Sequence, residues 1–86
     1  MRIEPDSIRL SGEGSLQCQL YQALRQPLLS GLWPRGALLP SSRVLASELG
    51  LSRNTVNAAL AQLVAEGYLQ GQAGRGYCII TQLPDH

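Results

Sequence analysis

The chain has 86 residues, 44% of them hydrophobic and 15% charged, which is typical of one small folded domain and excludes both a disordered tail and a two-domain protein. All seven basic residues are arginines, so no lysine is available for Schiff-base chemistry. The only histidine, His86, is the last residue, which argues against a histidine-dependent catalytic triad. We therefore expect no enzymatic activity on this chain.

The charge is nearly balanced overall but unevenly distributed. The formal net charge is +1 and the pI is about 7.8, below the range typical of strongly basic nucleic-acid-binding domains. Between Arg35 and Gly76, arginines outnumber acidic residues, whereas most acidic residues lie towards the two ends. The middle of the chain is therefore modestly basic.

Metal binding and membrane insertion have little support in the sequence. Cys18 and Cys78 lie far apart, with no Cys-x-x-Cys pair or Cys/His cluster near either, so we expect reduced, half-buried thiols and no metal site. No apolar run approaches the roughly 20 residues that span a bilayer, and residues 1–10 lack the hydrophobic stretch of a signal peptide. These patterns predict a cytoplasmic protein with no membrane partner.

The first elements in chain order are a lead-in and a long helix. Residues 1–14 are expected to be extended or loose, because Pro5 and several glycines interrupt any regular pattern. Leucines then recur at helical spacing from Ser15 to Gly31. Pro27 lies inside this pattern and predicts a kink or an early frayed last turn. The leucines expected in the core from this helix are Leu16, Leu20, Leu24 and Leu28.

A short strand and two more helices follow. Residues 37–39 are compatible with a short strand, and Ser41 or Ser42 can cap a second helix that ends at Gly50. Ser52 can cap the third helix. The core stripe predicted for this third helix consists of Val56, Ala59, Leu60, Leu63 and Val64.

The end of the chain predicts a β-hairpin. Beyond Gly67, residues 68–70 and 77–81 are typical of two short strands around the glycine-rich sequence GQAGRG. Two helices separated only by Gly50-Leu51 must cross steeply, which is the helix-turn-helix arrangement. The predicted fold is therefore mainly α with a small β-hairpin, a winged helix-turn-helix of three helices plus a wing over residues 15–81.

The third helix has an unusual exposed face. The side opposite its predicted core consists of Asn54, Ala58, Ala61 and Ala65, flanked by Asn57 and Gln62. Small side chains let a helix axis approach a partner closely, and asparagine can pair with adenine in the major groove. The free N–H groups at the helix start favour an anion such as a phosphate. Alternatively, Ser52 and Thr55 only cap the helix and the alanines only raise helix propensity.

Four segments, taken in order, resemble a known family. LYQALRQPLLSG, LPSSRVLASELGLSRNTV, QLVAEGYL and GRGY are similar to the winged-helix DNA-binding domain of the GntR family of bacterial transcription regulators. SRNTV together with QLVAEGYL most resembles the MocR subfamily, whose members join this domain to a large aminotransferase-like domain that binds pyridoxal phosphate. The resemblance covers roughly residues 15–81. It implies sequence-specific binding of double-stranded DNA by a transcription regulator.

The resemblance also implies roles for particular residues in the helix-turn-helix. Arg43, in the segment LPSSR, would contact DNA from the start of the second helix. In the segment SRNTV, Ser52 and Thr55 would hold phosphates, while Arg53 and Asn54 would face bases.

Two further parts of the family pattern concern the third helix and the wing. Asn57 stands where many members carry an arginine, and it remains a candidate DNA-binding residue. The family's Gly-X-Gly wing motif, which reaches the minor groove, falls on Gly74, Arg75 and Gly76. An arginine suits a narrow, electronegative minor groove.

A MocR-like protein would continue far beyond His86, and residues 82–86 resemble the start of a linker. No cofactor is then expected on this chain, because pyridoxal phosphate would belong to the part that follows. Useful affinity would come from a homodimer of the full-length protein on paired half-sites. The alternative is a winged helix used only for protein interaction or dimerisation, which the near-neutral pI favours.

Overall fold

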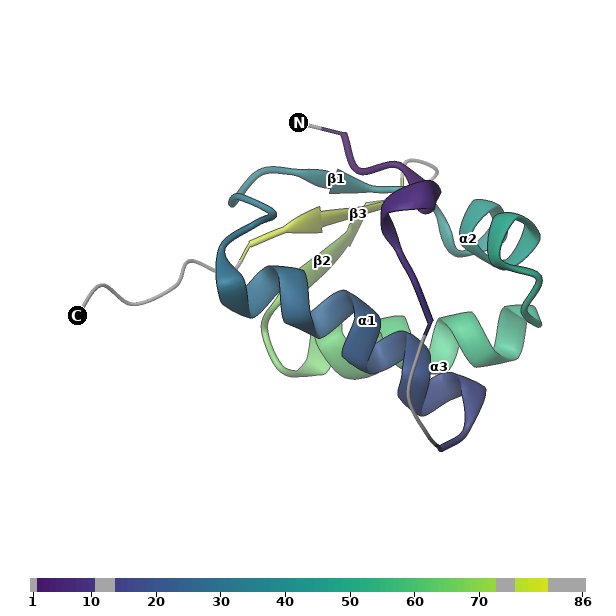
Figure 1. Ribbon diagram of the computed structural model, residues 1–86. Helices are drawn as coiled ribbons and strands as arrows, with labels where there is room; N and C mark the ends of the chain where they lie inside the picture. Colours follow the sequence, from purple (N-terminus) through teal and green to yellow (C-terminus); the bar gives the residue numbers. More distant parts are fainter. Residues whose placement is uncertain (1, 11–13, 73–75, 81–86) are drawn as a thin grey trace.

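The computed structural model describes residues 2–10, 14–72 and 76–80 of the chain. In chain order the elements are a short 3-10 helix η1 (Pro5–Ser7), α1 (Leu16–Ser30), β1 (Leu38–Leu39), α2 (Ser42–Leu49), α3 (Arg53–Ala65), β2 (Leu69–Gln72) and β3 (Gly76–Ile79). Figure 1 shows α1 and α3 below a small sheet, with α2 beyond the end of the strands. The predicted winged helix-turn-helix fold is confirmed.

Each α-helix begins at a serine whose side chain satisfies a free backbone N–H group of the first turn. The three N-cap hydroxyls accept hydrogen bonds from the third residue after them: Ser15 from Cys18, Ser41 from Val44 and Ser52 from Thr55. The cap predicted at Ser52 is confirmed, and Ser41, of the two serines considered, is the cap of α2. The cap of α1 at Ser15 was not predicted.

Pro27 does not end α1 early. The helix continues to Ser30 and is closed by Gly31 in the left-handed conformation. Leu24 and Leu28, on either side of the proline, are buried in the core. Their packing holds the last turn helical although the proline provides no N–H group. Of the two predicted alternatives, the early frayed last turn was therefore wrong, and the kink stays a prediction.

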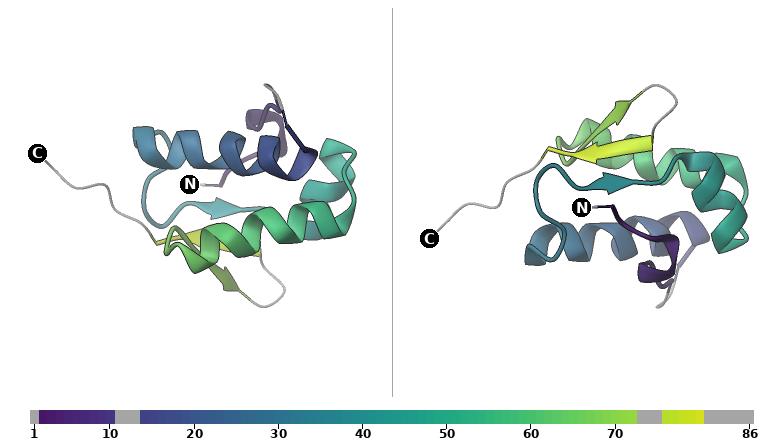
Figure 2. Two further views of the ribbon diagram at one scale, coloured as in Figure 1. Left: turned by 90° about the horizontal axis from the view of Figure 1, so that it is seen from below. Right: turned by 90° about the horizontal axis from the view of Figure 1, so that it is seen from above.

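The sheet has the strand order β1-β3-β2, and both pairings are antiparallel. β2 and β3 form the predicted hairpin, with Leu69 opposite Ile79. β1 adds a third strand, with Leu38 opposite Cys78. Figure 2 shows that α1 and α3 run side by side, and that the sheet packs at one end of the pair while α2 lies at the other.

The core lies between these layers. Its fully buried large side chains are Ile3, Leu20, Leu24, Leu39, Leu45, Val56, Leu60, Leu63, Leu69 and Ile79. Two expected core residues are instead exposed: Leu16 at 51% and Val64 at 39%. Leu16 belongs to the first turn of α1, outside the covered part of the helix. Val64 lies about 80° around α3 from Val56, beyond the buried arc.

Residues 2–10 of the lead-in are extended around η1, and they are not loose. Ile3 and Ile8 are 2% and 4% exposed, and the Ile3 N–H donates to the Leu38 carbonyl at 2.8 Å. Arg2 forms a parallel bridge with the same Leu38, so the segment extends the sheet beyond β1. The proposed division at residues 14/15 stays a prediction, and the proposed linker at 82–86 lies outside the described residues.

The remaining expectations concern the cysteines and membranes. Both cysteines are free, but Cys18 is exposed and only Cys78 is half-buried. Within residues 2–10, 14–72 and 76–80, no group of histidine, cysteine or acidic side chains could hold a metal ion, and no helix is long and apolar enough to cross a bilayer.

Candidate nucleic-acid interface

The turn between α2 and α3 fixes the helix-turn-helix. Gly50 has a φ of 70° and ends α2, because a residue with a side chain rarely adopts this left-handed conformation. The N–H groups of Gly50 and Leu51 both donate to the carbonyl of Ala46. The chain therefore leaves α2 at Leu49 and starts α3 at Arg53, with the predicted Gly50-Leu51 turn followed by the cap residue Ser52.

The first turn of α3 joins capping to a polar surface. The Ser52 hydroxyl accepts from the Thr55 N–H at 3.1 Å and donates to the Thr55 hydroxyl oxygen at 2.9 Å. The Ser52 proton is thus used inside the protein, whereas the Thr55 hydroxyl still has its own proton to donate. Capping and ligand binding are compatible at this helix start, since only one of the two hydroxyl groups is fully occupied.

The exposed face of α3 has the predicted composition. Arg53, Asn54 and Asn57 are exposed, and Ala58 is half-buried. Ala61, Gln62 and Ala65 continue the exposed surface towards the end of the helix. No acidic residue lies in the first turn. The start of α3 therefore presents a polar or basic surface, and alanine methyl groups follow it along the same face. Such small side chains allow a helix to approach a nucleic acid closely.

Arg43 and Arg53 stand at the starts of α2 and α3, and both are exposed. Neither guanidinium has a hydrogen bond or ion pair with any residue that the structure describes. Both cations are therefore available to an external anion.

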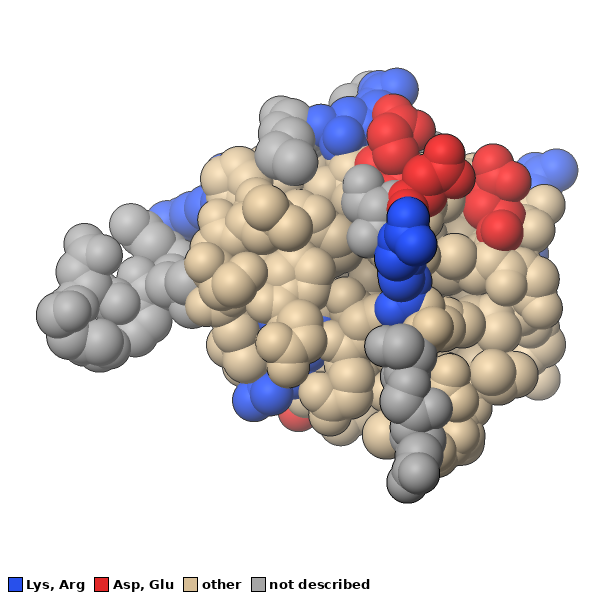
Figure 3. All heavy atoms as spheres, viewed as in Figure 1, with Lys and Arg blue, Asp and Glu red and all other residues tan. Residues whose placement is uncertain are grey.

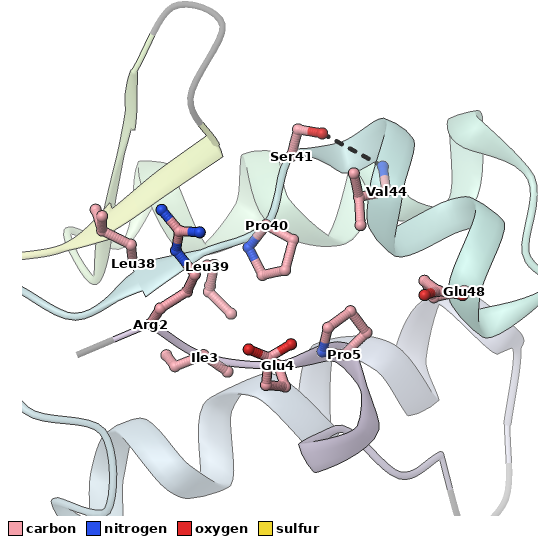
Figure 4. A pocket seen from close by; sticks show the side chains of 10 residues that line it. All are labelled: Arg2, Ile3, Glu4, Pro5, Leu38, Leu39, Pro40, Ser41, Val44 and Glu48. Atoms are coloured by element: carbon pink, nitrogen blue, oxygen red, sulfur yellow. Dashed lines mark hydrogen bonds between the residues drawn. The ribbon is translucent and has the colours of Figure 1, made fainter.

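Acidic side chains gather elsewhere. Figure 3 shows them together over η1 and the adjoining side of α2. Glu4 and Glu48 line one shallow groove of about 680 Å³ between the N-terminal segment and the β1–α2 connection. Figure 4 shows the groove with Arg2 and Pro5 on one wall and Val44 and Ser41 on the other. The groove therefore carries two carboxylates and the guanidinium of Arg2.

The wing is only partly described. Gly74 and Arg75, predicted to reach the minor groove, lie outside the described residues. Gly76 begins β3, is buried and has a φ of 99°. A Cβ atom at this position would collide with the Leu39 carbonyl oxygen. Gly76 therefore has a packing role that sequence reasoning missed, while its predicted contact with DNA stays a prediction.

A hydrogen bond fixes the joint between α3 and the wing. The Tyr21 hydroxyl donates to Glu66 Oε1 at 2.5 Å, which connects α1 to the residue that caps the end of α3. The N–H groups of Gly67 and Tyr68 then close the helix by donating to the Val64 and Leu63 carbonyls. The hydrogen bond to Glu66, followed by burial, raises the pKa of the Tyr21 hydroxyl.

Comparisons with known proteins agree with this geometry. The family model of bacterial regulatory proteins of the gntR family matches residues 16–79. The probable rhizopine catabolism regulatory protein MocR of Rhizobium meliloti is 43% identical over 67 residues, which are 78% of this chain and 14% of that protein. The transcriptional regulator TauR of Rhodobacter capsulatus is 42% identical over 74 residues, 86% of this chain and 15% of TauR.

Solved structures agree on the fold. YtrA from Sulfolobus acidocaldarius, a GntR-family transcription factor, has a TM-score of 0.76 at 30% identity and aligns with 90% of this chain and 83% of its own. The AraR DNA-binding domain in complex with operator ORX1 has a TM-score of 0.70 over 84% of this chain and 95% of its own. Its 22% identity shows the fold alone.

A helix-turn-helix whose second helix exposes amides and an arginine, followed by a hairpin, defines a winged-helix domain that reads double-stranded DNA. The chain belongs to the GntR family of bacterial regulatory proteins, with MocR-type regulators among its relatives. It is the sequence-specific DNA-binding domain of a transcription regulator. The chain spans about one-seventh of the length of MocR and TauR.

Proposed function

We propose that α3 lies in the major groove with Arg53 and Asn54 on base edges and Asn57 beside them. The observation that supports this most strongly is the exposed start of α3, where Arg53 has no partner among the described residues. Arginine can donate two hydrogen bonds to guanine, and asparagine pairs with adenine. The methyl groups further along the same face leave room for the helix to approach the bases.

Contacts to the DNA backbone would fix the register of this helix. Arg43 and the Thr55 hydroxyl each have a donor that is free to reach a phosphate, and the Ser52 hydroxyl oxygen lies beside that of Thr55. The wing residues Gly74 and Arg75 would enter the minor groove, with Gly76 at the base of the hairpin. With about three or four phosphates neutralised, log K would fall against log salt with a slope near −3 to −4.

Such a slope corresponds to weak binding by one domain at physiological salt, so we propose that two copies act on paired half-sites. The homodimer would be held by parts of a longer protein, as the much greater length of MocR and TauR suggests. Because bacterial chromosomal DNA is cytoplasmic, this function would place the protein in the cytoplasm.

Pyridoxal phosphate does not fit these 86 residues. The chain has no lysine, so it offers no amine for a Schiff base. We propose that this chain carries no cofactor and no enzymatic activity of its own, and that any pyridoxal phosphate of a MocR-type protein is bound by residues outside this chain.

Binding to a pool of randomised duplexes tests the base contacts. Arg53→Ala should cost about 1–3 kcal/mol of binding free energy and relax the preference at one position of the selected site. Arg9→Ala is the matched control, because it removes an equally exposed arginine from the lead-in. An equal loss on all sequences would assign Arg53 to the DNA backbone. No loss with any duplex would favour the alternative function, a protein-interaction or dimerisation module.

A further inference from the structure

At Gly76, the start of β3 packs closely against the backbone of residues 39–41. A Cβ atom built on this glycine collides with the Leu39 carbonyl oxygen and lies 3.0 Å from both the Pro40 carbonyl carbon and the Ser41 nitrogen. All three neighbours are backbone atoms, which cannot rotate away as the end of a flexible side chain can. The site therefore admits no side chain without a shift of the chain.

The backbone that meets Gly76 leads directly into α2. Leu39 is the last residue of β1 and pairs with Tyr77 in the sheet. Ser41 is the N-cap of α2, and its hydroxyl accepts from the Val44 N–H at 3.3 Å. Arg43 follows in the first turn of the same helix. The base of the wing thus rests against the segment that places the start of α2.

Two other glycines of the domain, Gly67 and Gly71, allow the effect of steric obstruction on a substitution to be distinguished from the effect of a positive φ. Gly67, with a φ of 88°, has open space around its Cβ position, so only its left-handed conformation disfavours a side chain. Gly71, on β2, has no positive φ, and its Cβ would lie 3.5 Å from the Tyr77 ring, an ordinary contact. Gly76 alone of these three combines a positive φ with a backbone obstruction.

We propose that Gly76 is a positioning residue for DNA binding, which sets the spacing between the wing and the start of α2. The start of β3 and the start of α2, which carries Arg43, would then be held in one fixed relation by a contact that only glycine permits. The proposal rests on the proposed contact of Arg43 with DNA. It gives the second glycine of the Gly-X-Gly motif a role inside the protein.

A series of three alanine variants tests the proposal. We expect Gly76→Ala to weaken binding to a duplex at low salt by about tenfold or more, comparable to the loss of one good contact. Gly67→Ala, at a positive φ of 88° without the obstruction, should lose clearly less affinity. Gly71→Ala should bind like the unchanged chain. Equal losses for Gly76→Ala and Gly67→Ala would overturn the proposal.

A second readout needs no DNA. In free Gly76→Ala, the amide chemical shifts of Ser42 and Arg43 should move, whereas in Gly67→Ala and Gly71→Ala they should not. Unmoved shifts in a folded Gly76→Ala would overturn the proposal. If Gly76→Ala does not fold, nuclear Overhauser effects between the Gly76 Hα protons and the Ser41 amide in the unchanged chain decide, and their absence would contradict the packing.

A double-mutant cycle separates this proposal from the proposed function. If Gly76 positions Arg43, the losses of affinity from Gly76→Ala and Arg43→Ala should not add, because the first already removes part of the second. Additive losses would mean that Gly76 does not position Arg43, and they would overturn the proposal. If Arg43→Ala has no effect on affinity while the Ser42 and Arg43 shifts still respond to Gly76→Ala, the proposed DNA contact fails and the packing role stands.

Discussion

At its first turn, α3 exposes Arg53 and Asn54 and offers groups without partners among the described residues, whereas at its last turn it is held from several sides. There Leu63 is fully buried, Glu66 accepts a hydrogen bond from Tyr21, and Gly67 closes the helix. The difference teaches that packing and a hydrogen bond fix one end of α3, while the polar side chains of the other end remain exposed. Variants at the two ends should therefore change different properties.

The largest expected effect is on stability, at the fixed end. Leu63→Ala should lower the free energy of unfolding by about 2–5 kcal/mol, because it leaves a cavity where a fully buried leucine packs. Val64→Ala is the neighbouring control, since Val64 is 39% exposed and should cost much less. Urea unfolding followed by circular dichroism measures both. Similar losses for the two variants would mean that the last turn of α3 is not packed as described.

A smaller effect is expected at the joint between α3 and the wing. Tyr21→Phe removes the hydrogen bond to Glu66 and should cost about 1 kcal/mol of stability at neutral pH. The pKa of Tyr21 is raised in the folded protein above its ordinary value of 10.0. The extra stability of the unchanged chain should therefore be complete below pH 10 and disappear as the pH rises through the folded pKa.

Urea unfolding of Tyr21→Phe and of the unchanged chain, from neutral pH to above pH 10, measures the difference in their free energies of unfolding. Ionisable groups that both proteins contain contribute equally and cancel in this difference. Absorbance of the ionised phenol gives a direct titration of the tyrosines. A constant stability difference between Tyr21→Phe and the unchanged chain through the alkaline range would contradict the hydrogen bond as its cause.

The smallest expected effect on stability is at the free end. Asn57→Arg should leave the free energy of unfolding within about 0.5 kcal/mol, because the side chain is exposed. It should tighten DNA binding and make the salt slope more negative by about 1, if the new arginine meets a phosphate. Binding measured at several salt concentrations gives the slope. An unchanged slope would place Asn57 away from the DNA backbone.

Local patterns account for what the sequence predicted correctly. The serine caps, the closing glycines and the buried face of α3 all depend on residues within a few positions of one another, so they can be read along the chain. The exposed start of α3 followed from the same periodicity. The predicted core failed at Leu16 and Val64, where the limit of burial depends on how far other elements extend.

Features that depend on distant contacts could not be predicted. Ile3 and Ile8 lie in a segment broken by Pro5, yet both are buried in the core, and Ile3 pairs with the edge of β1 at Leu38. The contact of Gly76 with Leu39 joins residues far apart in the chain, and so does the hydrogen bond from Tyr21 to Glu66. The Gly-X-Gly motif indicates that position 76 requires a glycine. The motif alone does not distinguish close packing inside the protein from close approach of the wing to DNA.

An amide chemical-shift titration of the 86-residue chain with a mixed-sequence duplex at low salt tests the central claim most directly, because it detects weak binding and locates it. The account predicts that shifts cluster at Arg43, at residues 52–58 and in the wing, and that the end of α3 around Glu66 stays unchanged. Absence of shifts at the first turn of α3, even at millimolar duplex, would contradict the proposed reading of DNA by this helix.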